Sequence, residues 1–543
     1  MHTTRLSKLT LTLLLGFIAA VTLGMLCQRH SLRHASHFAA GRLTRLFGTT
    51  AHTVGPTHVV MTSAAAERRV IIVVGSGLAG LAAAHEALQR GAHVRMLERG
   101  AKTGGNSIKA SSGINGAGTR FQKARGIETD TSFYGDTVRS AGARFAAAAA
   151  EDAAGIDRAG LVGTLTGRSA EAVAWLADDM GVDLGVVAPL GGHSVARTHR
   201  GAGALPPGAA IVTTLLKRLQ ADPRFELTTS AEVVGLMTAP GGAVTGGRQT
   251  HEKQRHELAG PVVFAAGGFA GDARGLLAQY RPDLAGMPST NEARPGAHGL
   301  LTDVGAELVD MDSVQIHPTG FVDPEAPAAQ YKFLAAEMLR GEGGILLSSD
   351  GRRFVNELAT REVVSRAIME ERQPAGDEAT VRQWDVTLVL DPGACEAAGS
   401  HLGFYLFKGF MEKKRVGELP PNMIEAVDRY AEVVASGQDN EFGRSSFGHW
   451  RLQPGKTNRE EVVCVGTVTP IVHFTMGGAA FDAEARVLRR GAGGVLEPIE
   501  GLWAAGEITG GVHGDNRLGG SSLLECAVFG RMAGQQAAKA LSG

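Results

Sequence analysis

Cysteine is scarce in this chain of 543 residues, which contains only Cys27, Cys395, Cys464 and Cys526. No two of them form a C-x-x-C pair, the spacing on which zinc ribbons, many iron–sulfur clusters and c-type haem attachment depend. We therefore expect no metal site. The sequence also offers no iron–sulfur ligand set and no c-type haem attachment through which electrons could arrive.

Charge of one sign is lacking as well, because the formal net charge is −1. A protein without an overall positive field, a basic arm or a known nucleic-acid motif is not expected to bind DNA or RNA. We therefore expect no nucleic-acid partner.

Acidic residues are absent before Glu67, although that stretch contains five arginines and one lysine. Residues 9–27 form an uncharged run of nineteen residues, long for the apolar part of a signal peptide and just long enough for a membrane anchor. An acid-free leader bearing Arg, Ser and Thr also suits mitochondrial import. Residues 1–66 are therefore interpreted as a targeting leader or membrane anchor, and the two alternatives imply the mitochondrion or the endoplasmic reticulum.

Glycine is abundant, with 74 residues, about twice the usual share. The glycines fall between apolar runs, as in an α/β protein with many tight turns. The first such run, at residues 70–74, leads directly into Gly75-x-Gly77-x-x-Gly80 and an Ala- and Leu-rich helix. In this context Gly75 permits a tight turn, Gly77 lets the backbone approach a pyrophosphate, and Gly80 lets helix and strand pack closely.

A second strand, at residues 93–97, ends in Glu98, eighteen residues after Gly80. An acidic residue in this position accepts a hydrogen bond from an adenosine ribose. Strand, glycine loop, helix and terminal acid together predict a Rossmann-like dinucleotide site.

The segment after Glu98 distinguishes FAD from a nicotinamide nucleotide. It is a long loop of Gly, Ser and Asn, where a nicotinamide-binding fold would enter another βα unit. Two later strands also end beside glycines or an acidic residue. With the loop, they give three separate places where the backbone can approach a ligand, which suits a ligand longer than a nucleotide. The residues concerned are Gly104, Gly105, Asn106, Ser107, Ser112, Gly113, Asn115 and Gly116 in the loop, Ala266, Gly267 and Gly268 after the strand at 261–266, and Glu507 at the end of the strand at 502–507.

These motifs, with several that follow them, resemble the flavoprotein of fumarate reductases and succinate dehydrogenases, and above all the soluble eukaryotic fumarate reductases. The resemblance runs from about Arg69 to the C-terminus. The motifs that carry it are GSGLAGLAAA, GGNSIKASSGINGAG, LGGHSVARTHR, QIHPTG, AAEMLRGEGGILL, GRRFVNELATR, HFTMGG and AAGEITGGVHGDNRLGGSSLLE.

The resemblance implies a discontinuous FAD-binding domain interrupted by a mobile α+β capping domain. The cap would begin just after His317 and end just before His473. The expected division is residues 67–320 and 469–543 for the FAD-binding domain and residues 321–468 for the cap.

The resemblance also assigns roles. Hydride would pass from FAD to the C=C bond of fumarate, and the proton would come from Arg361 in LATRE, with Glu337 and Arg340 as its relay. His317 and His473 match the substrate-binding histidines, and Arg517 matches the arginine that binds a substrate carboxylate. FAD contacts are implied for Leu78, Ala79, Arg99, Val234, Arg517, Gly520, Ser521, Ser522, Leu523 and Leu524.

Two departures from the family bear on the cofactor. Membrane-bound members attach FAD covalently to a histidine in the early loop, where this chain has Asn106 in GGNSIKASSG, so we expect non-covalent FAD. Many relatives also carry Thr-Gly-Asp-Gly after a Thr-Asn pair, whereas the loop at 292–301 here lacks that aspartate.

Reducing equivalents are expected to come from a diffusible donor or a partner, since the sequence offers no iron–sulfur cysteines and no haem motif. Direct oxidation of NADH stays open, although no second nucleotide fingerprint supports it. A diffusible donor is expected, either reduced flavin or NADH acting through a flavin reductase. Two alternatives to fumarate reduction remain at this point. One is a related flavin oxidoreductase acting on another unsaturated acid or on L-aspartate, and the other is a non-catalytic flavin-binding redox sensor.

Overall fold

The computed structural model describes residues 70–151, 155–203, 205–371 and 381–541. The leader at 1–66, with its apolar run at 9–27, lies outside the described residues. Within the described ranges, no helix combines the length and apolar character needed to cross a membrane.

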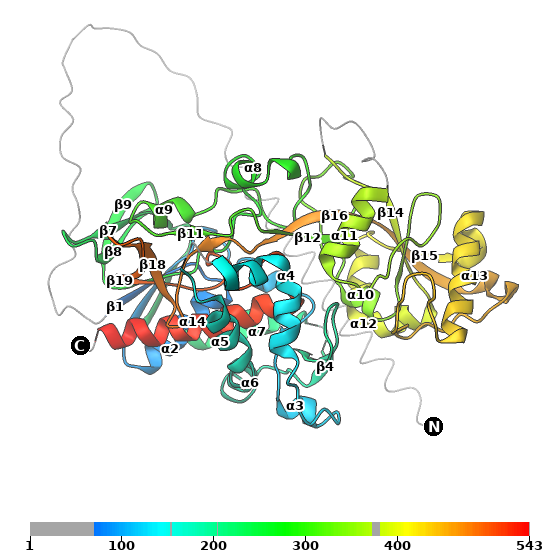
Figure 1. The fold of residues 1–543 in the computed structure, drawn as a ribbon, viewed down its shortest axis with the longest axis horizontal. Coiled ribbons are helices and arrows are strands. Elements are labelled where there is room, and N and C mark those ends of the chain that lie inside the picture. Colours follow the sequence, from blue (N-terminus) through cyan, green and yellow to red (C-terminus); the bar gives the residue numbers. More distant parts are fainter. Residues whose placement is uncertain (1–69, 152–154, 204, 372–380, 542–543) are drawn as a thin grey trace, which may run out of the picture. The chain divides into compact units, whose positions relative to one another are not determined.

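A six-stranded sheet forms the centre of the larger part of the molecule (Figure 1). Its first strand is apolar throughout and buried along nearly its whole length, which is typical of a parallel sheet covered on both faces. All neighbouring strands are parallel except β18, which pairs antiparallel with β19 at one edge. In spatial order the strands are β18 (Arg486–Arg490), β19 (Leu496–Ala504), β10 (Val262–Phe264), β1 (Val70–Val74), β2 (His93–Leu97) and β6 (Phe225–Thr228).

The two faces of this sheet are covered by different kinds of structure. Alternate residues of β1 point to opposite faces, so Ile71 and Val73 pack with helices whereas Ile72 and Val74 pack against a second sheet. The helices are α2 (Leu78–Gln89), α7 (Pro207–Gln220) and α14 (Ser521–Ala540), and the covering sheet is β7 (Glu232–Thr238), β8 (Val244–His251) and β9 (Gln254–Ala259).

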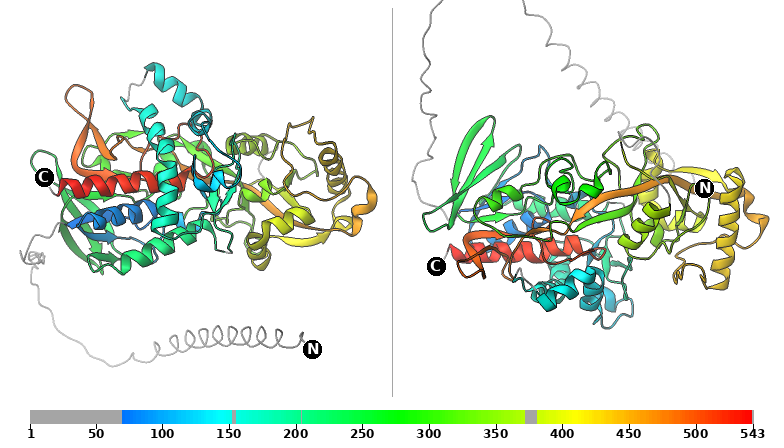
Figure 2. Two further views of the ribbon diagram at one scale, coloured as in Figure 1. Left: turned by 90° about the horizontal axis from the view of Figure 1, so that it is seen from below. Right: turned by 45° about the horizontal axis from the view of Figure 1, so that its top comes forward.

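Helices α2 and α14 lie side by side, as both figures show (Figure 1, Figure 2). Small residues allow this approach: a Cβ at Gly530 would stand 2.5 Å from the carbonyl oxygen of Ala79, and one at Gly534 would stand 2.2 Å from that of Ala83. The helix that follows the glycine loop is thereby packed tightly against the last helix of the chain.

The inserted part is built on an antiparallel sheet of strands β12, β16, β14 and β13, with β15 paired to β16. Its apolar core is formed by residues of this sheet and the helices on it. The strands are β12 (Val314–Phe321), β13 (Ile345–Leu347), β14 (Val386–Leu390), β15 (Glu412–Arg415) and β16 (Val462–Thr475), and the helices are α10 (Met338–Gly341), α11 (Arg361–Glu371), α12 (Pro392–Phe407) and α13 (Pro421–Ser436).

After this insertion the chain returns to the first sheet through β18 and β19, so the predicted fold class, a discontinuous α/β domain with an inserted cap, is confirmed. The predicted cap boundaries, at residues 321 and 468, coincide with the end of β12 and the middle of β16. These two strands pair with each other and connect the two parts, and the division into domains stays a prediction.

The remaining strands, helices and short helical turns complete the connections. Two further small sheets are β4 (Val186–Ala188), β5 (Thr198–Arg200) and β3 (Ile114–Asn115), and β11 (Leu308–Val309) with β17 (Gly478–Ala479). The helices are α3 (Arg120–Lys123), α4 (Phe133–Glu151), α5 (Arg158–Gly167), α6 (Ser169–Ala174), α8 (Leu276–Tyr280) and α9 (His298–Thr302), with short turns at Ser107–Lys109, Trp175–Asp179, Pro282–Leu284, Val416–Glu418 and Lys456–Glu460.

Candidate active site

The glycine loop between β1 and α2 has the geometry that its sequence predicts. Gly75 has φ +101°, and a Cβ there would stand 2.3 Å from the carbonyl oxygen of Ala265. A Cβ at Gly80 would stand 2.0 Å from the carbonyl oxygen of Gly75, so neither position has room for a side chain. Gly77 caps α2, leaving the first N–H groups of that helix at the start of a cavity, where an anion is stabilised.

Glu98 lies at the end of β2, where its carboxylate is held by the glycine loop. One oxygen accepts from the N–H of Ser76 at 3.1 Å and from its hydroxyl at 2.6 Å, and the other accepts from Gly100 N–H at 2.7 Å. Each carboxylate oxygen has further acceptor capacity. The side chain is therefore fixed in place and still able to receive a ribose hydroxyl.

A continuous cavity of about 810 Å³ runs from Glu98 past the ends of the central strands to Arg517. Ligands in open α/β sheets bind at this edge, beyond the carboxyl ends of the strands. Among the predicted cofactor residues, those that line the cavity are Gly75, Gly77, Leu78, Ala79, Glu98, Arg99, Gly105, Asn106, Ser107, Ser112, Gly113, Val234, Ala266, Gly267, Gly268, Glu507, Arg517, Gly520, Ser522 and Leu523.

Six other predicted cofactor residues lie behind this lining. Asn115 is an example: its side-chain amide donates to Gly519 O at 2.7 Å and to Ser521 Oγ at 3.1 Å, so it holds the start of α14 from outside the cavity. Leu524 is fully buried in the apolar core. The six are Gly80, Gly104, Asn115, Gly116, Ser521 and Leu524.

The far end of the cavity holds two arginines that converge on one oxygen. Arg361 Nη1 and Arg517 Nη2 donate to Gln315 Oε1 at 3.0 and 2.9 Å. The amide nitrogen of Gln315 donates in turn to Asn516 Oδ1 and to the carbonyl oxygen of Arg517. Gln315 belongs to the QIHPTG motif but was not among the predicted site residues, because a neutral amide gives no charge signal.

Glu337 forms an ion pair with Arg361 behind the cavity wall. Arg361 Nε donates to Glu337 Oε2 at 2.7 Å, and Gly191 N–H donates to Oε1 at 2.8 Å. Burial alone would raise the pKa of Glu337, but Arg361 and Arg340 outweigh it and lower that pKa to about 2. The carboxylate is therefore ionised at neutral pH.

Arg340 is also buried, and it lies in α10, three residues after Glu337. Its Nη1 donates to the carbonyl oxygen of Glu357, while its Nε and Nη2 have no partner among the described residues. Burial lowers the pKa of Arg340 to about 10, and Glu337 opposes that shift. The positive charges of Arg361 and Arg340 thus both act on Glu337, and Arg361 is the one that lines the cavity.

The two predicted histidines lie together, with ring centroids 5.3 Å apart. His473 lines the cavity, and its Nδ1 lies 3.2 Å from the hydroxyl of Thr290. His317 is fully buried behind it. Burial, followed by the positive charge of Arg361, holds the pKa of both rings well below the usual value, so both are neutral hydrogen-bonding groups.

Glu507 lies at the same end of the cavity. Its Oε1 accepts from Thr475 N–H at 3.0 Å, and a Cβ at Gly268 would stand 2.4 Å from that oxygen. Burial raises the pKa of Glu507 to about 7, although Arg517 acts in the opposite direction. A glutamic acid that holds its proton near neutrality is able to donate to a ligand as well as accept from one.

Sequence reasoning missed an aromatic group at the rim of the cavity. Tyr331, Phe333 and Phe404 line the cavity and are each more than a third exposed. Lys109 Nζ lies 5.4 Å from the centre of the Tyr331 ring. The signal was weak because the rings come from segments about seventy residues apart in the sequence.

The altered loop at 292–301 forms part of the cavity wall. Arg99 Nη1 donates to Pro295 O at 2.8 Å, and Arg294 also lines the cavity. His298, which begins α9, is fully buried, and neither of its ring nitrogens has a partner among the described residues. The loop therefore closes the adenosine end of the cavity without the aspartate that many relatives carry.

The donor set fits FAD. Glu98 suits a ribose, the start of α2 suits a pyrophosphate, and Glu507 with the start of α14 suits the polar edge of a flavin. Residues from both halves of the FAD-binding domain line the cavity between Glu98 and Arg517. The site therefore suits a ligand longer than a mononucleotide.

Comparison with known proteins agrees with this geometry. The profile of the FAD binding domain family matches residues 70–523. Fumarate reductase 1 of Saccharomyces cerevisiae is 40% identical over 495 residues, covering 86% of this chain and 98% of that protein. Fumarate reductase of Schizosaccharomyces pombe is 38% identical over 490 residues, covering 87% and 89%.

A solved structure shares the fold: the open conformation of a flavocytochrome c3 fumarate reductase superimposes with a TM-score of 0.67 at 30% identity, covering 88% of this chain and 79% of that one. The match of the FAD binding domain over most of the chain, together with these relatives, means that FAD is the cofactor. The chain belongs to the FAD-binding flavoproteins of the fumarate reductase family.

Proposed function

We propose that this protein reduces fumarate to succinate. The observation that carries the proposal is the convergence of Arg361 and Arg517 on Gln315 at the flavin end of the FAD cavity, with Arg361 ion-paired to the buried Glu337. When bound, FAD supplies the hydride. The names of the relatives support the choice of fumarate as substrate.

Arg517 and the two histidines are proposed to bind the substrate. Fumarate is a flat dianion, and negative charge develops beside one carboxylate as the C=C bond is reduced, so fixed donors are needed at both ends. The guanidinium of Arg517 suits bidentate binding of a carboxylate, and its position over the Phe474 ring, 4.4 Å from its centre, restricts its orientation. His473, which lines the cavity, would donate a hydrogen bond without adding charge. His317 lies behind His473, so its predicted role requires its Nε2, which has no partner among the described residues, to be reached from the cavity.

Arg361 is proposed to donate the proton, with Glu337 and Arg340 returning one to it. An arginine gives up a proton only with difficulty, so prompt reprotonation by a neighbour is needed. Glu337 is within hydrogen-bonding distance of Arg361. The charge of Arg340 also acts on Glu337, and two guanidinium nitrogens of Arg340 have no partner among the described residues. This arrangement supports a relay that runs through buried groups.

FAD is proposed to be bound without a covalent bond, since Asn106 occupies the cavity wall in the loop where covalent relatives have histidine. Denaturing the purified protein with acid and separating the precipitate tests this. Yellow colour in the supernatant is the expected result, and colour that remains with the precipitated polypeptide would contradict it.

The electron donor is proposed to be diffusible, either reduced flavin or NADH acting through a flavin reductase. The exposed rings of Tyr331, Phe333 and Phe404 at the cavity rim support a flat aromatic donor. Stopped-flow spectroscopy of the oxidised holoprotein would follow bleaching of its FAD. Reduced FMN should bleach it rapidly and NADH alone should not.

The reaction itself is tested with the full chain and a reduced dye as electron donor. Fumarate should give dye oxidation, whereas urocanate and acrylate derivatives should give little. Aspartate and succinate can only be oxidised, so they are assayed with an oxidised dye, and aspartate should give little dye reduction. Turnover of another member of this panel in place of fumarate would favour a different flavin oxidoreductase. Bound FAD with no turnover of any member would favour a redox sensor.

The cellular location is proposed to be the mitochondrion or the endoplasmic reticulum, with residues 9–27 as the membrane tether if the leader is an anchor. The acid-free, Arg-bearing leader supports this. Imaging of a reporter fused to residues 1–66, beside one fused to the chain without them, tests the proposal. A diffuse signal from both fusions would contradict it.

A further inference from the structure

The relay carboxylate has a partner outside the predicted catalytic residues. Glu337 Oε2 is occupied by Arg361, and Oε1 accepts the N–H of Gly191 at 2.8 Å. Gly191 lies in the segment between β4 and β5, within the LGGHSVARTHR motif that the proposed reaction leaves without a role. The carboxylate is thus oriented from both sides.

Gly191 has little room for any other residue. A Cβ there would stand 2.9 Å from the carbonyl oxygen of Ala359 and 3.0 Å from Glu337 Oε1. At the neighbouring Gly192, a Cβ would stand 3.1 Å from a methyl carbon of Leu518. The turn at Gly191 and Gly192 is therefore packed between the cap residues that precede α11 and the segment that carries Arg517.

His193 ties the same turn to the FAD-binding part. Its Nε2 lies 3.0 Å from Gly519 O, two residues after Arg517. Burial, followed by the charge of Arg197, lowers the pKa of His193 to about 4, so the ring is neutral at physiological pH. Because a carbonyl oxygen only accepts, the proton must be on Nε2, and the ring donates to Gly519.

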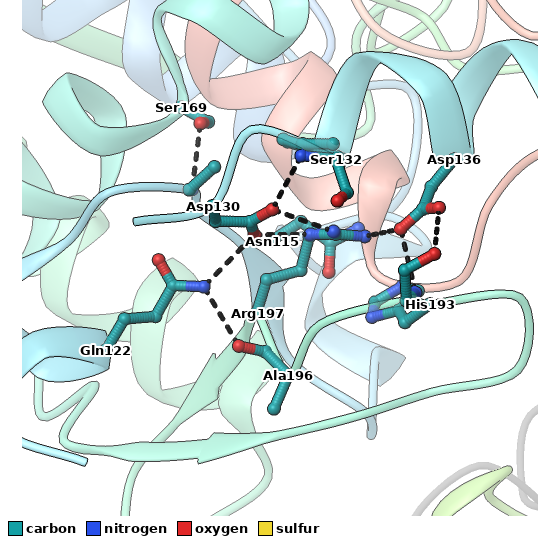
Figure 3. Close-up of polar contacts among 12 residues, drawn as sticks. Asn115, Gln122, Asp130, Ser132, Asp136, Ser169, His193, Ala196 and Arg197 are labelled. Carbon is teal, nitrogen blue, oxygen red and sulfur yellow. Dashed lines mark hydrogen bonds and ion pairs between the residues drawn. The ribbon is translucent and has the colours of Figure 1, made fainter. Parts of the chain in front are cut away.

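A buried ion-pair network anchors the other end of this segment (Figure 3). Asp136 accepts from Ser194 N–H at 2.8 Å, from the Ser194 hydroxyl at 2.6 Å and from Arg197 Nη1 at 2.6 Å. Arg197, which is fully buried, also donates twice to Asp130, at 2.8 and 3.0 Å. Buried charges persist only where hydrogen bonds and partners satisfy them, as they do here.

We propose that residues 190–197, which we name the anchored loop, form a positioning element for proton delivery. In it the N–H of Gly191 holds one oxygen of Glu337, so that the other orients the Arg361 guanidinium toward the substrate. Gly191 is therefore a positioning residue that acts through Glu337. This inference rests on the proposed function and adds to it a residue that acts through its backbone N–H instead of a charged side chain.

The test is Gly191→Ala in the FAD-loaded full chain, assayed with fumarate and a reduced dye. The new Cβ is 2.9 Å from a backbone oxygen, so the turn must move away from Glu337. We expect kcat to fall roughly tenfold, as for loss of a hydrogen bond to a charged group, with KM changed by less than about twofold. Gly203→Ala is the matched control, since a Cβ there meets no atom within 4 Å.

A double-mutant cycle with Glu337→Gln separates positioning from general structural damage. If Gly191 acts through Glu337, adding Gly191→Ala to Glu337→Gln should lower kcat by less than about twofold more. Losses that multiply in full would overturn the inference. So would a Gly191→Ala variant with the kcat of the wild type.

Ser194→Ala is a second variant for the case in which Gly191→Ala does not retain FAD. It removes one hydroxyl bond from Asp136, and we expect an approximately threefold lower kcat with the same lack of additivity toward Glu337→Gln. Unchanged kcat in this variant would also contradict the inference. If the wild type itself does not turn over fumarate, the proposed function and the inference fail together, whereas wild-type kcat in the variants contradicts the inference alone.

Discussion

Arg361 donates to two acceptors of different character, the ionised carboxylate of Glu337 and the neutral amide oxygen of Gln315. Two donors fixed at an angle leave the guanidinium plane little freedom to rotate. A proton donor must be positioned before the reaction, since reorganisation during it would add to the barrier. The neighbouring side chains of Arg361 therefore matter as much as its charge.

The first prediction concerns this geometry. Arg361→Lys keeps a positive charge but loses the fork that reaches both acceptors, and kcat with fumarate should fall roughly 10²- to 10⁴-fold. The visible spectrum of bound FAD should stay unchanged, which is measured on the same sample. Arg366→Lys is the control, because Arg366 lies five residues further along α11 and is exposed. Turnover of Arg361→Lys within threefold of the wild type would exclude Arg361 as the donor.

The second prediction concerns pH and Glu507. Its pKa in the folded protein is about 7, above the usual value near 4.3, because it is buried. The folded state thus holds this proton more tightly than the unfolded state. The contribution of Glu507 to stability is complete below about pH 4.3 and is lost as the pH rises to 7, so charged Glu507 destabilises the fold above pH 7.

Glu507→Gln, which cannot ionise, should therefore raise the melting temperature of the FAD-free protein at pH 8 by roughly 2–4 °C relative to the wild type. At pH 5 the two proteins should melt closer together. Differential scanning fluorimetry across this range measures the effect. A difference that is the same at both pH values would show that Glu507 does not titrate between them.

At the scale of elements, the contact between α2 and α14 determines where the phosphate end of the site lies. The first N–H groups of α2 face the cavity, and α14 packs on α2 through Gly530 and Gly534. Helices approach this closely only where one side offers no side chain.

The third prediction tests this contact. Gly534→Ala places a Cβ 2.2 Å from the carbonyl oxygen of Ala83, which the backbone of α2 cannot avoid without moving. Overpacking of this kind should lower the free energy of unfolding by about 1–3 kcal/mol, measured by thermal or urea unfolding of the holoprotein. Gly163→Ala in α5 is the control, because a Cβ there meets nothing within 4 Å and alanine favours a helix. Equal stability of the two variants would contradict the prediction.

Much of this arrangement could be predicted from the sequence because the signals are local. The turn at Gly75, the start of α2 and the acid at Glu98 occur within thirty residues, and each needs its own residue type for a stated backbone reason. The roles of Arg361 and Arg517 came from resemblance, and the structure places both in the cavity wall. Those roles stay predictions until the variants are measured.

What could not be predicted depends on contacts between distant segments. Gln315 and Gly191 contribute an amide oxygen and a backbone N–H, which carry no charge pattern and become visible only when β12, α10 and the anchored loop are brought together. The aromatic rim has the same origin. Asn115 and Leu524 were predicted to bind the cofactor because their motifs lie at the site. Their side chains do not line the cavity: Asn115 holds the start of α14, and Leu524 is buried in the apolar core.

At the scale of the whole molecule, the FAD cavity combines residues from both halves of the discontinuous FAD-binding domain. Its wall includes Gly75 near the start of the described residues and Leu523 near their end. A ligand in such a cavity binds only when both halves of the discontinuous domain are folded together.

The fourth prediction follows from this linkage. Added FAD should raise the melting temperature progressively, with a gain in stability of about 2.7 kcal/mol when the FAD concentration is a hundred times the dissociation constant. FMN, which cannot reach the ribose and pyrophosphate positions near Glu98, should stabilise less at equal concentration. Melting curves of FAD-depleted protein across a titration of each flavin measure this. Equal effects of FAD and FMN would show that the adenosine end contributes nothing.

Strand β16 limits where the caps of related proteins can be exchanged. It is fourteen residues long, with its first half paired to cap strands and its second half carrying His473 to the cavity. Successive side chains on a strand point to opposite faces, so a shift of one residue would turn His473 away from the substrate. A cap exchanged between relatives must therefore be joined within β12 and β16 with the number of residues before His473 unchanged, and insertions belong in the loops.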